Sequence, residues 1–248
     1  MIIPPKIARI PVIWELRKLT LYGLSLIKTT LKYRTVSVFC EGVIFFPRWW
    51  KYQQKNNNPL KNDIPWITFK AENFLSKTLR QDMKIFEYGS GSSTLYFSRR
   101  VARVYSVEHN PEWHQKILDT LDSHAIKNVE CRLTEPEIMN ENQALDYVSR
   151  SSLYADKNFA SYVKSINEYP DGFFDIVIVD GRSRTRCISH AKIKIKKGGY
   201  LVVDNSDREY YFEGNDYLYN ENEWKSCHFI GPIPYSFEFS KTSVFQKK

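Results

Sequence analysis

The segment FEYGSGSST, residues 86–94, connects a predicted strand, Lys84–Tyr88, to a predicted helix, Thr94–Arg100. Its two glycines, Gly89 and Gly91, let the backbone approach a ligand closely. A ligand at the carboxyl end of a strand lies where open α/β sheets bind their substrates. A Gly-x-Gly pair alone is only weakly specific for a nucleotide-type site, so the neighbouring residues must decide its function.

Glu87 and Thr94 distinguish this loop from a dinucleotide-binding loop, and Glu108 adds support for a nucleotide-type site. Glu87 lies two residues before Gly89, where a dinucleotide fold normally has an apolar residue, and Thr94 replaces the third glycine of that motif. Glu108 ends the next predicted strand, where an acidic residue can accept both hydroxyls of a ribose. The alternative for Glu108 is a solvated carboxylate at the end of a strand.

The segments EYGSGSST and YSVEHN resemble the first two motifs of the class I S-adenosylmethionine-dependent methyltransferases. The resemblance implies that Glu87 helps to position the ammonium group of S-adenosylmethionine and that Glu108 takes its ribose. It also implies that Glu135, after the third predicted strand, lies near the adenine, although an ordinary surface glutamate is the alternative. The methionine part would be held by the backbone around Gly89, Ser90, Gly91, Ser92 and Ser93, the last of which departs from the third glycine often found there.

Short apolar runs alternate with helical patterns from residue 65 onward. This alternation predicts a Rossmann-like α/β fold, in which a mostly parallel sheet carries helices on both faces and ends in a C-terminal antiparallel hairpin. The predicted strands are Lys84–Tyr88, Arg103–Glu108, Val129–Leu133, Asp175–Asp180, Tyr200–Asp204, Ser226–Ile230 and Thr242–Phe245, and the further helices are Pro111–Leu121, Lys157–Ile166 and Thr185–Ile195.

Oxygen-bearing side chains end the fourth and fifth predicted strands, in FFDIVIVDGRSR and GGYLVVDNSDREYY. Asp180 and the pair Asp204-Asn205 therefore converge at neighbouring strand ends, and hard oxygen ligands of this kind suit Mg²⁺ or Ca²⁺. The arrangement is similar to that of metal-dependent O-methyltransferases, in which the corresponding residues bind the ion. The alternative is that the two aspartates cap helices.

Three arginines after Asp180, namely Arg182, Arg184 and Arg186, depart from the small-molecule subgroup of that family. Guanidinium groups bind carboxylate and phosphate in bidentate fashion, which suggests an acidic or phosphorylated substrate, unless these side chains face solvent. The insertion 136–170 contains Tyr147, Tyr154, Phe159 and Tyr162, which could stack on a sugar or form the core face of a helix. We predict Arg182 and Tyr154 as substrate contacts.

Together these residues predict methyl transfer from S-adenosylmethionine to a hydroxyl of a small-molecule, saccharide or lipid-linked acceptor. A Mg²⁺ ion held by Asp180, Asp204 and Asn205 could orient the hydroxyl and lower its pKa. Without a metal, Asp180 is the candidate base. Two alternatives from other classes stay open. One is an RNA methyltransferase that uses a basic N-terminal arm, although an N/D-P-P-Y/F-type loop is missing after strand four, and the other is a non-catalytic binding module.

Charge divides the 248-residue chain into two parts. The net charge is +8, yet residues 1–70 hold 12 Lys/Arg against 3 Asp/Glu, and the remainder is nearly neutral. We predict a basic, aromatic-rich extension over residues 1–62 and a catalytic domain over 63–248. A basic amphipathic segment can bind an anionic membrane surface or a partner, or pack on its own domain. Four widely spaced cysteines indicate a reducing cytosol, so we expect a cytoplasmic protein, peripheral at the inner face of the membrane.

Overall fold

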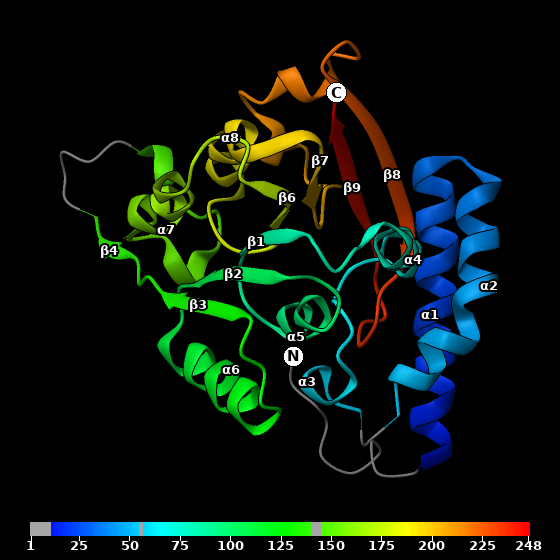
Figure 1. Ribbon diagram of the computed structural model, residues 1–248. Coiled ribbons are helices and arrows are strands. Elements are labelled where there is room, and N and C mark those ends of the chain that lie inside the picture. The colour runs from blue at the N-terminus through cyan, green and yellow to red at the C-terminus, as the bar shows by residue number, and fades with distance from the viewer. Residues whose placement is uncertain (1–10, 55–56, 140–144) are drawn as a thin grey trace.

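A seven-stranded sheet forms the centre of the computed structural model, which describes residues 11–54, 57–139 and 145–248. Its strand order is β3-β2-β1-β6-β7-β9-β8, with the first five strands parallel and β9 antiparallel to both β7 and β8. This confirms the predicted Rossmann-like sheet and its antiparallel hairpin (Figure 1). The strands are β1 (Lys84–Tyr88), β2 (Arg103–Glu108), β3 (Val129–Leu133), β6 (Phe174–Val179), β7 (Ile195–Val203), β8 (Trp224–Pro232) and β9 (Phe239–Lys247).

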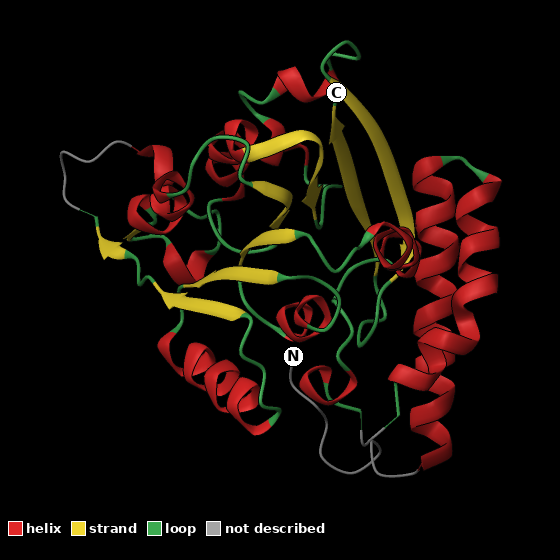
Figure 2. Cartoon of the chain, viewed as in Figure 1, coloured by secondary structure: helices red, strands yellow, loops and turns green. Residues whose placement is uncertain are grey.

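Apolar residues on both faces of the central strands bury the sheet between two layers of helices (Figure 2). Along β6, Ile176 and Ile178 pack on one face, while Val177 and Val179 pack on the other. The first face is covered by α4 (Phe69–Thr78) and α5 (Ser92–Ser98), and the second by α7 (Ala160–Lys164) and α8 (Arg184–Lys194). Beside β3 lies α6 (Pro111–Ser123), and α3 (Pro59–Asn62) is a single turn beside α5.

The helix predicted over Lys157–Ile166 is wrong in its first part. Residues Lys157–Asn158 form a short strand, β5, which pairs with β4 (Glu137–Ile138). The side chain of Asn158 then accepts a hydrogen bond from the backbone amide of Ala160 at 2.7 Å, so the asparagine forms a turn in front of the helix instead of continuing it. Helix α7 follows, and the 3₁₀ turn Ser165–Glu168 continues it.

The N-terminal residues form a helical hairpin of α1 (Pro11–Tyr33) and α2 (Val36–Tyr52), which stands beside β8 and β9 (Figure 1). The hairpin is tied to the loop between those strands, because the indole of Trp49 donates to the carbonyl of Ser236 at 2.6 Å. An aromatic cluster around Tyr22, Trp49 and Phe69 fills the contact. The arm therefore packs on its own domain through one side, while the predicted boundary at residue 62 stays a prediction. Across the described residues, none of the helices has the length and apolar character that a bilayer crossing requires.

Candidate functional site

The loop after β1 is held close to the loop after β6. Gly89 has a φ of +94°, a conformation that side-chain-bearing residues rarely adopt. A Cβ added there would lie 3.0 Å from Cα of Gly181 and 3.3 Å from the carbonyl carbon of Asp180. Gly89 is therefore required by the fold itself, because it lets the ends of β1 and β6 approach each other.

Gly91 has a different local environment. Its φ of 178° is extended backbone that any residue adopts, and an added Cβ would meet only Ser93 Oγ, at 3.9 Å. Its amide donates to Thr94 Oγ1 at 2.9 Å, which fixes the start of α5. The protein packing thus leaves open space at Gly91, on the side that faces a cavity.

Glu87 lies beneath this loop and is fully buried. Its carboxylate accepts hydrogen bonds from the hydroxyls of Ser93, of Thr94 at 2.5 Å and of Ser106 at 3.1 Å. Burial raises the pKa of Glu87 to about 7, although these hydrogen bonds lower it in part. Glu87, predicted to position the ammonium group, therefore accepts hydrogen bonds from two residues after β1 and from one residue of β2.

Glu108 joins the same loop to the end of β2. One of its carboxylate oxygens accepts from the amide of Ser90 at 3.0 Å, and the other accepts from the amides of His109 and Asn110 at 2.8 and 2.9 Å. Burial alone would raise the pKa of Glu108, but the hydrogen bonds from His109 and Asn110 outweigh it and lower the pKa. Glu108 is thus held ionised in the lining of a cavity.

A cavity of about 560 Å³ lies over this loop and collects most of the predicted cofactor residues. Glu87 is buried below it, and Glu135 is exposed and outside its lining. Tyr154 and Arg182, predicted as substrate contacts, line it as well. The predicted cofactor residues that do line it are Gly89, Ser90, Gly91, Ser92, Ser93 and Glu108.

Two tryptophans of the cavity were missed by sequence reasoning. Trp113, in the first turn of α6, donates from its indole to the carbonyl of Ser90 at 2.8 Å and so fixes the loop. Trp66 is 45% exposed at the cavity wall. Asn110 caps α6 two residues after Glu108, and this capping signal could have placed Trp113 beside the site.

The insertion contributes one aromatic to the cavity and buries others. Tyr154 OH lies 3.0 Å from Nε2 of His109, and the guanidinium of Arg182 lies over its ring at 5.0 Å. Phe159 and Tyr162 are fully buried in the core, as the core-face interpretation expected. The insertion therefore places Tyr154 at the cavity and uses Phe159 and Tyr162 for packing.

Asp180, Asp204 and Asn205 line a smaller cavity of about 280 Å³ beside the first one. Asp204 accepts a hydrogen bond from Thr242 Oγ1 at 2.8 Å, and the amide of Asn205 donates to Ser240 Oγ at 3.1 Å. Burial, followed by repulsion from Asp180, raises the pKa of Asp204 to about 7. Burial also raises the pKa of Asp180, against the opposing effect of Arg184. The structure thus brings the three predicted metal ligands together.

Arg184 is the cation already present among these carboxylates. Its guanidinium donates to Asp180 Oδ1 at 2.8 Å and to the backbone carbonyls of Asp180 and Asp204 at 2.9 and 2.6 Å. Only 9% of the residue is exposed, so it neither faces solvent nor points freely at a substrate. Arg184 ties the end of β6 to the end of β7.

The donor set still fits a divalent cation. Two carboxylates and an amide oxygen at one cavity are the ligands that Mg²⁺ and Ca²⁺ prefer, and one guanidinium compensates only one of the two negative charges. Within the described part of the chain, no group of three or more His, Cys, Asp or Glu side chains is arranged to hold a metal. The predicted set contains two such residues, so its third ligand would be the amide.

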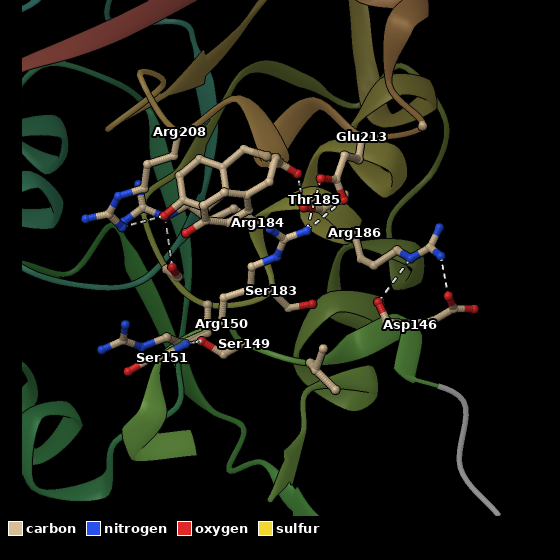
Figure 3. Close-up of a pocket in the computed structure, with 16 residues that line it drawn as sticks. Asp146, Ser149, Arg150, Ser151, Ser183, Arg184, Thr185, Arg186, Arg208 and Glu213 are labelled. Carbon is tan, nitrogen blue, oxygen red and sulfur yellow. Dashed lines mark hydrogen bonds and ion pairs between the residues drawn. The ribbon is translucent and has the colours of Figure 1, made fainter. Parts of the chain in front are cut away.

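A third cavity, of about 740 Å³, adjoins the one of about 560 Å³. We call the latter the cofactor cavity, after the predicted cofactor residues that line it. The two share Gly181, Arg182 and Arg184 as walls. Figure 3 shows this third cavity, with Arg208 at one side and the pair of Arg186 and Asp146 at the other. The site therefore consists of a loop-lined cavity and an arginine-lined cavity that meet at the end of β6.

Comparison with known proteins finds similarity in structure only. No family model matches the sequence, and no curated protein matches it with significance. A proposed O-methyltransferase from Klebsiella pneumoniae has a TM-score of 0.55 at 13% identity, covering 84% of this chain and 96% of that one. An O-methyltransferase from Bacillus cereus in complex with SAH has a TM-score of 0.51 at 12% identity, covering 77% and 90%. An rRNA methylase from Streptococcus thermophilus has a TM-score of 0.51 at 14% identity, covering 75% and 98%.

These similarities establish the fold of the chain. It is the Rossmann-like fold of class I S-adenosylmethionine-dependent methyltransferases, with the strand order and terminal hairpin described above. The neighbours include proteins named as O-methyltransferases and as an rRNA methylase. The same fold therefore occurs in proteins named for different methyl acceptors.

Proposed function

We propose that this protein transfers a methyl group from S-adenosylmethionine to a hydroxyl of a small-molecule, saccharide or lipid-linked acceptor. The observation that carries the proposal is the position of Asp180 in the wall of the cavity over the loop after β1. Gly181, Arg182 and Arg184, which follow Asp180 in the chain, line both this cavity and the arginine-lined one. A methyl donor and an anionic acceptor in these cavities would meet next to a carboxylate.

The cofactor roles follow from the contacts of the loop. The open space at Gly91 would accept the methionine part of the cofactor against the backbone. Glu108, buried and ionised, would accept hydrogen bonds from the ribose hydroxyls. Glu87 would hold the loop through Ser93 and Thr94, so that its effect on the ammonium group comes through the loop. The solved neighbour in complex with SAH supports this cofactor class.

In the absence of a metal, Asp180 would act as the base that removes the proton of the acceptor hydroxyl. Methyl transfer is an in-line displacement, so the protein has to align the nucleophile with the methyl carbon and accept its proton. A base is most effective when its pKa lies near the working pH, and burial moves the pKa of Asp180 upward in that direction. Arg184 would hold the carboxylate in one orientation through its bond to Oδ1.

Binding of Mg²⁺ by the same carboxylates is the alternative to direct proton removal by Asp180. Asp180, Asp204 and Asn205 would hold the ion, which would orient an acceptor oxygen and lower the pKa of its proton. Their shared cavity and the raised pKa of Asp204 support the assignment, because a cation there would offset the repulsion between the two aspartates.

Calorimetric titration with S-adenosylmethionine and SAH, followed by transfer from labelled donor to hydroxyl acceptors, tests the proposal. We expect Asp180→Asn to bind the cofactor like the wild type and to lose transfer by roughly 100-fold or more. Asp82→Asn is the matched control, since Asp82 is 74% exposed and lines none of the three cavities. A chain that binds neither cofactor nor product would be a non-catalytic module on this fold.

RNA is the second candidate acceptor, because one structural neighbour is named as an rRNA methylase and the site is lined with arginines. Binding of RNA through the basic hairpin would weaken steeply with salt. A Lys28→Glu/Lys32→Glu variant should then lose RNA binding while the hairpin keeps its packed aromatic cluster. RNA affinity that this variant leaves unchanged would argue against the arm as an RNA-binding element.

A further inference from the structure

The arginine-lined cavity holds more positive charge than its own carboxylates can compensate. Arg150 donates to both carboxylate oxygens of Glu213 at 3.0 and 2.8 Å, and Arg186 pairs with Asp146 at 2.5 Å. Arg182 and Arg208 lie within ion-pair distance of no carboxylate in the described part of the chain. The arginines of the lining are Arg150, Arg182, Arg184, Arg186 and Arg208.

The start of α8 forms one wall of the same cavity. This helix has eleven residues, and Ser183 at its cap makes no capping hydrogen bond with its side chain. Ser183 is 7% exposed, its hydroxyl is buried without a hydrogen-bond partner, and the residue lines the cavity. The first amides of a helix carry partial positive charge and bind anions. Beside these amides, the hydroxyl of Ser183 is a further donor that no group of the described residues uses.

We propose that this cavity binds a phosphate group of the methyl acceptor. Donors come from different parts of the lining, which includes Ser183 and the first residues of α8 as well as Arg208, and Figure 3 shows Ser183 and Arg208 in different parts of the view. A tetrahedral phosphate offers oxygens in all of these directions and two negative charges, whereas a planar carboxylate offers two oxygens and one charge. Because the cavity meets the cofactor cavity at Gly181 and Arg182, a hydroxyl a few bonds from the phosphate would reach Asp180.

This inference rests on the proposed methyltransferase function, and its test separates the two. The full chain is titrated calorimetrically with inorganic phosphate, glucose 1-phosphate, glucuronate and glucose, and separately with S-adenosylmethionine. We expect phosphate and glucose 1-phosphate to bind, glucose not to bind, and glucuronate to bind at least tenfold more weakly than glucose 1-phosphate. Arg208→Gln/Ser183→Ala should lower glucose 1-phosphate affinity at least tenfold and leave cofactor affinity unchanged, because neither residue lines the cofactor cavity.

Arg132→Gln is the matched control, since Arg132 forms an exposed pair with Glu168 away from this lining. Equal phosphate affinity in the double variant and the wild type overturns the assignment, and so does glucuronate that binds as well as glucose 1-phosphate. If the cofactor binds and no phosphate does, the phosphate site is wrong and the cofactor assignment stands. If phosphate binds and the cofactor does not, the proposed methyltransferase function is wrong.

A second inference comes from the outer side of the helical hairpin. Ten of the sixteen exposed large hydrophobic residues among the described positions lie on α1 and α2. On α1 they follow helical spacing along one side at Leu16, Leu24, Ile27 and Leu31. On α2 they do the same at Val36, Phe39, Val43 and Ile44, whose exposed fractions reach 75%. An uncovered apolar face of this extent marks a contact with a partner or a membrane.

The charges beside this apolar face are positive. Both acidic residues of α1 and α2 are already paired, Glu15 with Lys18 at 2.9 Å and Glu41 with Lys70. Arg17, Lys28 and Arg34 are exposed on the same hairpin. A second copy docked on this face would bring like charges together, whereas an anionic bilayer surface compensates them.

The geometry points to the outer face of α1 and α2 as a binding surface for an anionic lipid bilayer. Co-sedimentation of the full chain with phosphatidylglycerol vesicles, and with phosphatidylcholine vesicles as the uncharged comparison, tests it. We expect preference for phosphatidylglycerol and at least a tenfold loss of bound protein in Leu31→Asp/Val43→Asp. Leu153→Asp is the control, because Leu153 is 80% exposed outside the hairpin. Thermal unfolding confirms that each variant folds.

Vesicle binding that the double variant retains overturns the assignment. A dimer in analytical ultracentrifugation that Leu31→Asp/Val43→Asp abolishes, without vesicle binding by the wild type, assigns the face to a second copy instead.

Discussion

The guanidinium of Arg184 donates both to a carboxylate oxygen of Asp180, at 2.8 Å, and to the backbone carbonyl of the same residue, at 2.9 Å. The charge of the proposed base is therefore balanced by a residue four positions later, at the start of α8. Without this cation, the pKa of Asp180 would rise further, since burial already raises it.

For Arg184→Gln we expect the acid limb of the pH–rate profile to move to higher pH, because Asp180 stays protonated longer. The free energy of unfolding should fall by about 1–3 kcal/mol, because the pair with Asp180 is lost. The loss stays in this range because 31% of the Asp180 side chain is exposed, so water partly replaces the pair. Urea unfolding and the pH–rate profile measure the two effects. Arg80→Gln, which removes an exposed pair with Asp82, should change stability by less than about 1 kcal/mol.

The two loop glycines should respond differently to alanine. Gly89→Ala places a Cβ against Gly181 in a positive-φ conformation and should lower the melting temperature. Gly91→Ala meets only Ser93 Oγ and should leave the melting temperature nearly unchanged, yet weaken S-adenosylmethionine binding by roughly tenfold or more. Calorimetry and thermal unfolding separate the two effects. Unchanged cofactor affinity in Gly91→Ala would place the cofactor away from this loop.

Glu87 should make stability depend on pH near neutrality. Its pKa is about 7 in the folded protein and 4.5 for an unperturbed glutamate, so between these values the folded state binds the extra proton. The contribution of Glu87 to the free energy of unfolding is therefore fully present below pH 4.5 and is lost as the pH rises through 7. Compared with Glu87→Gln, the wild type should lose about 2 kcal/mol more between pH 5 and pH 8. Parallel stability curves for the two proteins would show that Glu87 does not titrate in this range.

Mg²⁺ should stabilise the folded protein through Asp204, and more strongly at pH 8 than at pH 6. The pKa of Asp204 is about 7, and a metal ligand must be deprotonated, so protons compete with the ion at the lower pH. We expect Mg²⁺ to raise the melting temperature of the wild type at pH 8 and EDTA to reverse it, with no rise in Asp204→Asn. Asp156→Asn, at an aspartate that is 71% exposed, should respond like the wild type. A wild type without any Mg²⁺ response would contradict the metal assignment.

The sheet and the glycine loop could be predicted because their signals are local. Alternating apolar runs and Gly89, Gly91 and Glu108 lie within a few residues of the strand ends that position them. The partners of the site come from distant segments. Thr242, which binds Asp204, lies 38 residues away on β9, and Arg208 reaches the arginine-lined cavity through the packing of a 3₁₀ turn. No spacing rule links such residues, so only the folded chain brings them together.

The role of Arg184 also depends on contacts that the sequence does not reveal. The sequence placed it beside Asp180 as a substrate contact or a solvent-facing arginine, but its burial depends on two backbone carbonyls at the ends of neighbouring strands. Those acceptors exist only after β6 and β7 pair. A charged residue in a loop therefore gave the location of the site, while its role followed from the tertiary structure.

The docking of the helical hairpin on the loop between β8 and β9 has a consequence for protein synthesis. Trp49 and Ser236, whose hydrogen bond fastens the helical hairpin, are 187 residues apart. At ribosomal rates of about 5–20 residues per second, the hairpin would wait roughly 10–40 s before its docking surface is translated. During that interval the nascent chain exposes the aromatic side of α1 and α2 as well as the outer one, and early contact with a chaperone or a lipid surface would protect it from aggregation.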